Sequence, residues 1–239
     1  MKTLIINGSP SGEKGKTWWA LERFIQGMEK AGAQVSVLNL AGKNIHYCTG
    51  ELACWFKTPS QCIHKDDMQA MLPMLTDVRA LVLATPVYVD GMSGLLKNFI
   101  DRLVVGADPH LKLTHGHTRH VSKNNTIKQI ALVSVCGYPE LDNFSPLIHH
   151  VEAMCKNFEA DFSGAILRPQ APALDVAKIY HPLKYRSISN ATKQAGQEFI
   201  RDGEIKADTA DLAAQEIFPQ EEYIKAANKE FDKVLKARP

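Results

Sequence analysis

A turn rich in glycine and serine, placed between an apolar strand and an amphipathic helix at the start of the chain, limits the fold most. The apolar run covers residues 3–6, the turn 7–15, and a helical pattern follows from residue 16. Such a turn at the carboxyl end of a parallel strand points backbone N–H groups and a helix N-terminus at one place, where a phosphate is stabilised. The side chains that could add hydroxyl groups or a positive charge are Ser9, Ser11, Lys16 and Thr17.

Two other nucleotide-binding loops fit this turn less well. Its end, Gly15-Lys16-Thr17, matches the end of the P-loop motif, but that motif requires a glycine where Pro10 stands, and proline has no N–H group. The dinucleotide fingerprint G-x-G-x-x-G is also absent, because the glycines stand at 8, 12 and 15. The turn therefore favours a loop that holds a single phosphate, as in flavodoxins.

Composition excludes several classes of protein. The chain has 239 residues, of which 45% are hydrophobic, and this is enough for one sizeable core. A net charge of +2 without basic clusters gives no reason to expect nucleic acid as a partner. No apolar run approaches the length of a membrane span or a secretory signal, so we expect no membrane span and a cytoplasmic protein. The five cysteines fit reduced thiols better than a disulfide framework.

Short apolar runs alternate with helical patterns along the first 168 residues. We predict strands at 3–6, 34–40, 79–85, 128–135 and 162–167, and helices at 16–31, 66–75, 93–103 and 143–158. This alternation predicts an α/β fold: a doubly wound, five-stranded parallel sheet of the flavodoxin type, covered on both faces. Ligands of such sheets bind at the carboxyl ends of the strands.

Two segments fall outside this alternation. Residues 104–126 form a long polar connection with four histidines, which we interpret as a solvated or subunit-contacting loop rather than a metal site. Residues 169–239 begin with a proline-containing loop, and helical patterns follow at 188–202, 208–217 and 220–236. We expect a helical extension of the domain formed by 1–168, packed on the core or on a neighbouring subunit and not folded independently.

Two further loops follow predicted strands. The loop after residue 85 carries Pro86, which stiffens the chain, and Tyr88 and Met92, which offer surface on which a planar ring could lie. An isolated pair of this kind would be read more simply as a cap on the core. The loop after residue 135 contains Gly137, where backbone could approach a ligand closely. With the first turn, three loops are predicted to converge on one crevice.

At this point the chain resembles the flavodoxin-like NADPH-dependent FMN reductases, in particular the branch that includes the iron-sulfur flavoproteins. The resemblance covers nearly the whole chain, and the segments that carry it are Asn7-Gly8-Ser9-Pro10, Cys48-Thr49-Gly50, Cys54-Trp55-Phe56-Lys57-Thr58-Pro59, Asp66-Asp67-Met68, Thr85-Pro86-Val87-Tyr88, Met92-Ser93, Leu96-Lys97, Asp101-Arg102 and Cys136-Gly137. It implies a bound FMN whose phosphate contacts Ser9, Ser11, Gly15, Lys16 and Thr17. The isoalloxazine would contact Pro86, Val87, Tyr88 and Met92, and be bounded by Cys136 and Gly137.

The resemblance also implies an activity. A hydride would pass from NAD(P)H to FMN and on to a small-molecule acceptor such as a quinone or a flavin, in a homo-oligomer, a dimer or a tetramer, with flavin sites at subunit contacts. The cofactor supplies this chemistry and needs no dedicated acid or base, so we predict no catalytic residue. The alternative is an electron carrier or FMN-binding module without NAD(P)H turnover. Small carriers of this fold are usually strongly acidic, and a net charge of +2 argues against that role.

The cysteine segment, residues 46–66, departs from the iron-sulfur branch. Where the relatives carry four cysteines, this chain has Cys48, Glu51, Cys54 and Cys62. A carboxylate is a poor substitute for a thiolate at iron, so we do not expect an intact iron–sulfur cluster and predict no metal ligands. A zinc site that uses the neighbouring His46 and His64 remains an alternative, although the spacing lacks the Cys-x2-Cys pairing of compact zinc sites. The third interpretation is a loop of buried or redox-active thiols.

Overall fold

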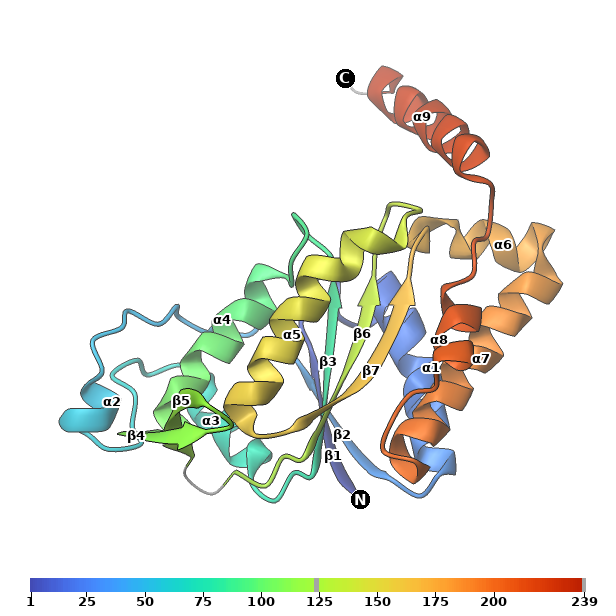
Figure 1. Ribbon diagram of the computed structural model, residues 1–239. Coiled ribbons are helices and arrows are strands. Elements are labelled where there is room, and N and C mark those ends of the chain that lie inside the picture. The colour runs from blue at the N-terminus through green and yellow to red at the C-terminus, as the bar shows by residue number, and fades with distance from the viewer. Residues whose placement is uncertain (123–124, 238–239) are drawn as a thin grey trace.

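The predicted five-stranded parallel sheet is confirmed. A computed structural model describes residues 1–122 and 125–237 of the chain. The strands of the sheet lie in the order β2-β1-β3-β6-β7, and every neighbouring pair is parallel (Figure 1). Their bounds are β1 Lys2–Asn7, β2 Gln34–Asn39, β3 Ala80–Pro86, β6 Gln129–Val135 and β7 Asp161–Arg168. The three central strands are almost wholly buried, which explains their continuous apolar runs.

Helices cover both faces of the sheet, as predicted. Helices α4 (Gly94–Arg102) and α5 (Ser145–Phe158) pack on one face, and their apolar stripes join Leu4, Leu81 and Leu132 of the strands in one core. Helix α1 (Lys16–Lys30) packs on the other face, together with α7 (Pro182–Arg201). The chain thus forms three layers around two cores.

Helices α1 and α7 approach each other unusually closely. A Cβ atom added at Gly27 of α1 would lie 1.9 Å from the carbonyl oxygen of Lys193, and one added at Gly196 of α7 would lie 2.1 Å from that of Phe24. Each glycine therefore admits the backbone of the other helix. Trp19 at the start of the crossing donates its indole N–H to the hydroxyl of Tyr185 at 2.9 Å. This crossing docks the C-terminal extension on the sheet.

A buried arginine at the end of β7 also ties the extension to the sheet. Arg168 is 1% exposed, and its guanidinium donates hydrogen bonds to the carbonyl oxygens of Pro169, Ala213, Ala214 and Gln215. Two of those residues end helix α8 (Ala207–Ala214). Burial lowers the pKa of Arg168 to about 10, which still leaves it charged at neutral pH. A cation at the C-terminus of a helix also interacts favourably with the helix dipole.

The extension contains more helix at its start than predicted, and its last helix packs less closely on the rest of the domain than predicted. Helix α6 (Leu174–Tyr180) occupies part of the predicted proline loop, and α7 begins six residues before the predicted residue 188. Helix α9 (Gln220–Lys236) has the predicted bounds, but it buries no residue and points away from the body beyond the carboxyl ends of the strands (Figure 1). No helix within the described part of the chain has both the length and the apolar character needed to cross a membrane.

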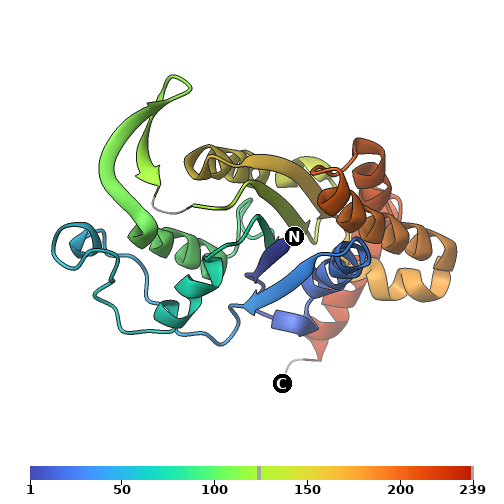
Figure 2. The ribbon, with the colours of Figure 1, turned by 90° about the horizontal axis from the view of Figure 1, so that it is seen from below.

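The predicted polar connection at 104–126 is instead a hairpin. Strands β4 (Ala107–Thr114) and β5 (His117–Ser122) pair antiparallel around a turn in which His115 and Gly116 both have positive φ. The hairpin projects beside the cysteine segment, away from the main sheet (Figure 2). Its side chains are mostly solvated, so the sequence lacks the apolar alternation that identifies a strand. Residues 123 and 124 of this segment lie outside the described residues.

The predicted helix at 66–75 is shorter than expected. Helix α3 covers Met68–Met71 and continues as a 3-10 turn, Leu72–Leu75, which contains Pro73. A proline cannot donate the backbone hydrogen bond that a regular helix needs. The cysteine segment before it is mostly irregular, apart from the four-residue helix α2 (Ala53–Phe56).

Candidate functional site

The first turn gathers hydroxyl groups around a glycine. Ser9 and Thr17 are almost fully buried, and Gly12 has φ +52°, a conformation that favours glycine. A Cβ atom added at Gly15 would lie 3.1 Å from Ser9 Oγ and 3.0 Å from Ser11 Cβ. Both serines therefore crowd the space above Gly15. We call this space, bounded by Ser9, Ser11 and Gly15, the cradle, and a side chain at position 15 would fill it.

A short chain of side-chain contacts orders this turn. Asn7 Oδ1 accepts a hydrogen bond from the N–H of Ser9 at 3.1 Å, and Asn7 Nδ2 donates to Asn39 Oδ1 at 2.8 Å. Asn39 Nδ2 in turn donates to Glu13 Oε1 at 2.9 Å. The turn is thus held in shape by side chains at the ends of β1 and β2.

Helix α1 leaves its N-terminus available to an anion. Gly15 is its N-cap residue, and no side chain of the described residues caps the helix there. The first N–H groups of a helix have no partner within the helix, and they carry the positive end of its dipole. The ammonium group of Lys16 is turned to one side, where it pairs with Asp175 at 2.6 Å. In the arrangement described, backbone N–H and hydroxyl groups, and not the ammonium of Lys16, face the candidate anion site.

The second loop is a tight turn that presents an aromatic ring. Tyr88 and Gly91 exchange two backbone hydrogen bonds, of 3.0 and 3.1 Å, around Val89 and Asp90, which both have positive φ. The side chain of Val89 is completely exposed, and a β-branched residue in this conformation is strained. Tyr88 is 53% exposed, whereas Met92 is buried beneath the turn. The loop therefore presents an exposed aromatic ring above a buried methionine.

One serine locks the first two loops together. Ser93 donates its hydroxyl to the carbonyl of Gly8 at 2.6 Å and accepts a hydrogen bond from the N–H of Leu96 as the N-cap of α4. Its own N–H donates to Thr85 Oγ1 at 2.9 Å. A Cβ atom added at Gly8 would lie 2.5 Å from Leu96 Cβ, so only glycine permits this close packing.

The third loop leaves an open strip of backbone at Gly137. Cys136 is buried, and its sulfur accepts a hydrogen bond from the N–H of Tyr138 at 3.4 Å. Burial raises the pKa of the Cys136 thiol, so it stays neutral at physiological pH. No atom lies within 4 Å of a Cβ added at Gly137. The hydroxyl of Tyr223, in the first turn of α9, donates to the Gly137 carbonyl and brings α9 to the edge of this loop.

The three loops end three adjacent strands. β1, β3 and β6 are neighbours in the sheet, and the chain reverses its direction of winding between β1 and β3. Ligands of open α/β sheets bind at such a switch point, outside the carboxyl ends of the strands. The residues of the predicted site that lie at the ends of these three strands or in the loops after them are Ser9, Ser11, Gly15, Lys16, Thr17, Pro86, Val87, Tyr88, Met92, Cys136 and Gly137.

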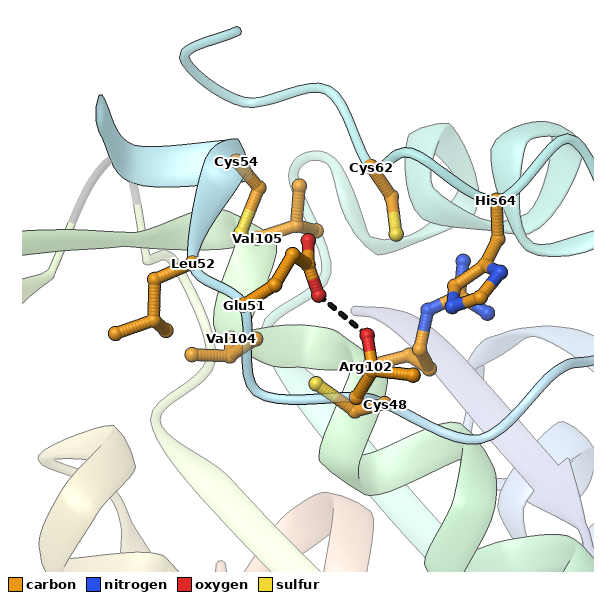
Figure 3. A pocket seen from close by; sticks show the side chains of 10 residues that line it. Cys48, Glu51, Leu52, Cys54, Cys62, His64, Arg102, Val104 and Val105 are labelled. Atoms are coloured by element: carbon orange, nitrogen blue, oxygen red, sulfur yellow. Dashed lines mark hydrogen bonds between the residues drawn. The ribbon is translucent and has the colours of Figure 1, made fainter. Parts of the chain in front are cut away.

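A second cluster lies in the cysteine segment (Figure 3). The side chains of Cys48, Glu51, Cys54 and Cys62 line one small pocket, which is closed by α4 and the residues that follow it. Thr49 donates its hydroxyl to Glu51 at 2.6 Å, and this bond lowers the pKa of the Glu51 carboxyl. Burial raises the pKa of the Cys54 thiol, and negative charge on Cys62 and Glu51 would raise it further.

A buried ion pair anchors this segment to the domain. Arg102, the last residue of α4, donates to Asp66 at 2.7 Å and to the carbonyl of His46 at 2.7 Å. Both members of the pair are at most 1% exposed. Burial alone would raise the pKa of the Asp66 carboxyl, but the hydrogen bonds from Arg102 and from two backbone N–H groups outweigh burial and lower it to about 2.

The ion pair of Asp66 and Arg102 makes the free energy of unfolding depend on pH in the acid range. Because the folded-state pKa of Asp66 is about 2 and its ordinary value is 3.8, the unfolded chain binds the proton more readily. The contribution, about 2 kcal/mol, is fully present above about pH 5 and is lost as the pH falls through 2. We expect urea unfolding of the wild type between pH 5 and 2.5 to show this loss, and Asp66→Asn to lack it. Parallel acid profiles for the two proteins would contradict the assignment.

Comparison with known proteins identifies the family. The family model described as NADPH-dependent FMN reductase matches residues 1–138, a segment that contains all three loops of the crevice. The chain belongs to this family.

The names of curated relatives of this FMN reductase family member mention iron and sulfur as well as flavin. An iron-sulfur flavoprotein from Archaeoglobus fulgidus is 33% identical over 117 residues, which are 48% of this chain and 52% of that protein. One from Clostridioides difficile is 25% identical over 200 residues, which are 77% of this chain and 87% of that protein. The chain spans about half the length of the first curated relatives that it matches.

Solved structures confirm the fold of this family member. An FMN-dependent NADH-azoreductase from Bacillus anthracis, solved in complex with FMN, aligns with a TM-score of 0.62 at 15% identity, over 84% of this chain and 99% of that one. An NAD(P)H:quinone oxidoreductase from Methanothermobacter marburgensis aligns with a TM-score of 0.59 at 14% identity, over 83% of this chain and 96% of that one.

Several residues of these sites were not predicted as such. Ser93 and Arg102 were recognised only within matching segments, and Tyr223 and Asp175 were not considered at all. Ser93 lies 85 residues from its partner Gly8, and Arg102 lies 36 residues from Asp66. Tyr223 lies 86 residues from Gly137, and Asp175 lies 159 residues from Lys16. A serine directly before a helical pattern is a recognisable N-cap signal, but nothing local indicates its second contact with Gly8.

Proposed function

We propose that the chain is an FMN-dependent oxidoreductase that passes a hydride from NAD(P)H to bound FMN and on to a quinone, a flavin or a similar acceptor. The observation that carries this proposal is the cradle at Gly15, where two serine hydroxyls meet the uncapped N-terminus of α1. That arrangement fits a phosphate monoester, because its donors are neutral groups that converge on one point. FMN, when bound, supplies the hydride chemistry.

The chain's own residues bind, orient and shield the cofactor. In this proposal Ser9, Ser11, Gly15 and Thr17 hold the phosphate, and Lys16 contributes through its backbone because its ammonium pairs with Asp175. Pro86, Val87 and Met92 form the base on which the flavin ring lies. The exposed ring of Tyr88 would stack on the flavin or cover it, and Cys136 and Gly137 would bound it. No side chain is assigned a proton-transfer role.

Two further properties belong to this proposal. We expect a homo-oligomer, a dimer or a tetramer, and the exposed apolar side chains of α9, among them Ile224, Phe231 and Leu235, support it. We also expect the protein to work in the cytoplasm. Its five cysteines, all within the described residues, form no disulfide there, and this fits a reducing compartment.

Anaerobic reduction distinguishes the enzyme from an electron carrier. The protein loaded with FMN should lose its flavin absorbance on addition of NADPH or NADH and regain it when a quinone is added. Alternation of two substrates at one crevice also predicts parallel lines in steady-state plots. If neither reduced nicotinamide bleaches the flavin although FMN is bound, the chain is a carrier or a binding module instead.

A further inference from the structure

The cysteine pocket does not offer what a four-iron cluster requires. Relatives named iron-sulfur flavoproteins imply such a group, and four-iron clusters are held by four cysteine thiolates. Three cysteines of this chain line the pocket, Cys48, Cys54 and Cys62. The fourth donor on the same pocket is the carboxylate of Glu51, separated from Cys48 and from Cys54 by two residues each.

The geometry places Glu51 where a fourth thiolate would be needed. Figure 3 shows its carboxylate among the three sulfur-bearing side chains, directed into the pocket. The segment that carries it is bent at Gly50 and Leu52, both with positive φ, and Thr49 holds the carboxylate by a 2.6 Å hydrogen bond. Glu51 is exposed to solvent, and its loop and Thr49 hold its carboxylate at the wall of the pocket.

A site for a single metal ion does not explain the grouping of these thiols better than a site for a four-iron cluster does. Among the residues that the structure describes, no group of three or more His, Cys, Asp or Glu side chains is arranged to hold one metal ion. His64 lines the same pocket, and its buried Nε2 has no hydrogen-bond partner among the described residues. The three thiols and Glu51 therefore line one small pocket without being arranged as ligands of a single ion.

We propose that Glu51 is the single residue that prevents this chain from retaining a four-iron cluster. Three thiolates can each hold one iron, but the fourth iron would meet a hard carboxylate oxygen where it requires a soft sulfur ligand. The pocket of this chain therefore lacks the fourth thiolate that a four-iron cluster would need. The pocket of this chain is accordingly a thiol site beside the flavin domain, one substitution away from a cluster site.

The experiment compares the wild type with Glu51→Cys. Both proteins, residues 1–239, are purified anaerobically with FMN bound and incubated with ferric iron, sulfide and a thiol reductant, and unbound iron is removed. We expect Glu51→Cys to hold about four irons and four sulfides per chain, with the electron paramagnetic resonance signal of a reduced four-iron cluster. The wild type should hold no stoichiometric cluster, or one with about three irons.

Two matched variants control for the added thiol and the lost charge. Gln61→Cys adds a cysteine to the same segment at an exposed position that does not line the pocket, and Glu51→Gln removes the charge without adding sulfur. Neither should gain a cluster, and all variants should keep their FMN content, which shows that they fold. Four irons and four sulfides in the wild type would overturn the proposal. So would a Glu51→Cys protein that binds FMN but no four-iron cluster, or stoichiometric zinc in the wild type and the variant alike.

Discussion

Replacing Thr17 with glutamate is expected to abolish FMN binding. Thr17 is 1% exposed and lies in the first turn of α1, directly after the cradle formed by Ser9, Ser11 and Gly15. A glutamate side chain there would fill the cradle and place a carboxylate at the helix N-terminus, where it would compete with the phosphate and repel it. Loss of one charge-assisted hydrogen bond alone costs about 1.5–3 kcal/mol, a factor of about ten to about a hundred and fifty in affinity. Steric clash and charge repulsion add to this loss, so we expect affinity to fall by at least about a hundredfold.

Titration of the apoprotein with FMN, followed by flavin fluorescence, measures this effect. Thr17→Ser, which keeps the hydroxyl, should bind FMN nearly as well as the wild type. Riboflavin, which lacks the phosphate, should bind the wild type much more weakly than FMN does. Equal affinity of the wild type for riboflavin and FMN would mean that the first turn does not recognise phosphate.

Adding one methyl group at Gly196 is expected to destabilise the whole protein. The new Cβ atom would lie 2.1 Å from the carbonyl oxygen of Phe24 and 3.0 Å from the backbone nitrogen of Met28, and backbone atoms in α1 cannot move aside as a side chain could. Helices α1 and α7 would have to separate, which would open the core beneath them. We expect Gly196→Ala to lose about 3 kcal/mol of unfolding free energy, although alanine favours helix by about 1 kcal/mol.

Gly94→Ala is the matched control, because Gly94 is also helical and no atom lies within 4 Å of its added Cβ. It should be neutral or slightly stabilising in urea unfolding at neutral pH. A Gly196→Ala protein as stable as the wild type would show that the two helices do not cross as closely as described.

The sequence was sufficient to predict the sheet and the positions of the three loops. Apolar runs identify buried parallel strands directly, and the turns that end them are marked by glycine, serine and proline at Gly15, Pro86 and Gly137. Because parallel strands end at one edge of a sheet, convergence of these loops followed from the fold prediction alone.

What the sequence could not predict were contacts between distant, polar positions. Lys16 was expected on the phosphate, but the structure pairs its ammonium with Asp175 of the C-terminal extension. The hairpin formed by β4 and β5 was missed because its side chains face solvent and carry no apolar period. The ion pair of Asp66 with Arg102 joins two elements whose separate patterns give no sign of a common partner.

The contacts of Arg168 bear on whether the sheet domain can fold without the C-terminal extension. The family model stops at residue 138, and a flavodoxin-sized fragment would stop where β7 does, at the arginine itself. Such a fragment would leave the guanidinium without the three carbonyl groups of residues 213–215 that now bind it. The fragment would also expose the apolar face of the sheet that the extension now covers with Ala195, Phe199 and Ala213. We therefore expect residues 1–168 not to fold stably without the C-terminal helices that cover the sheet.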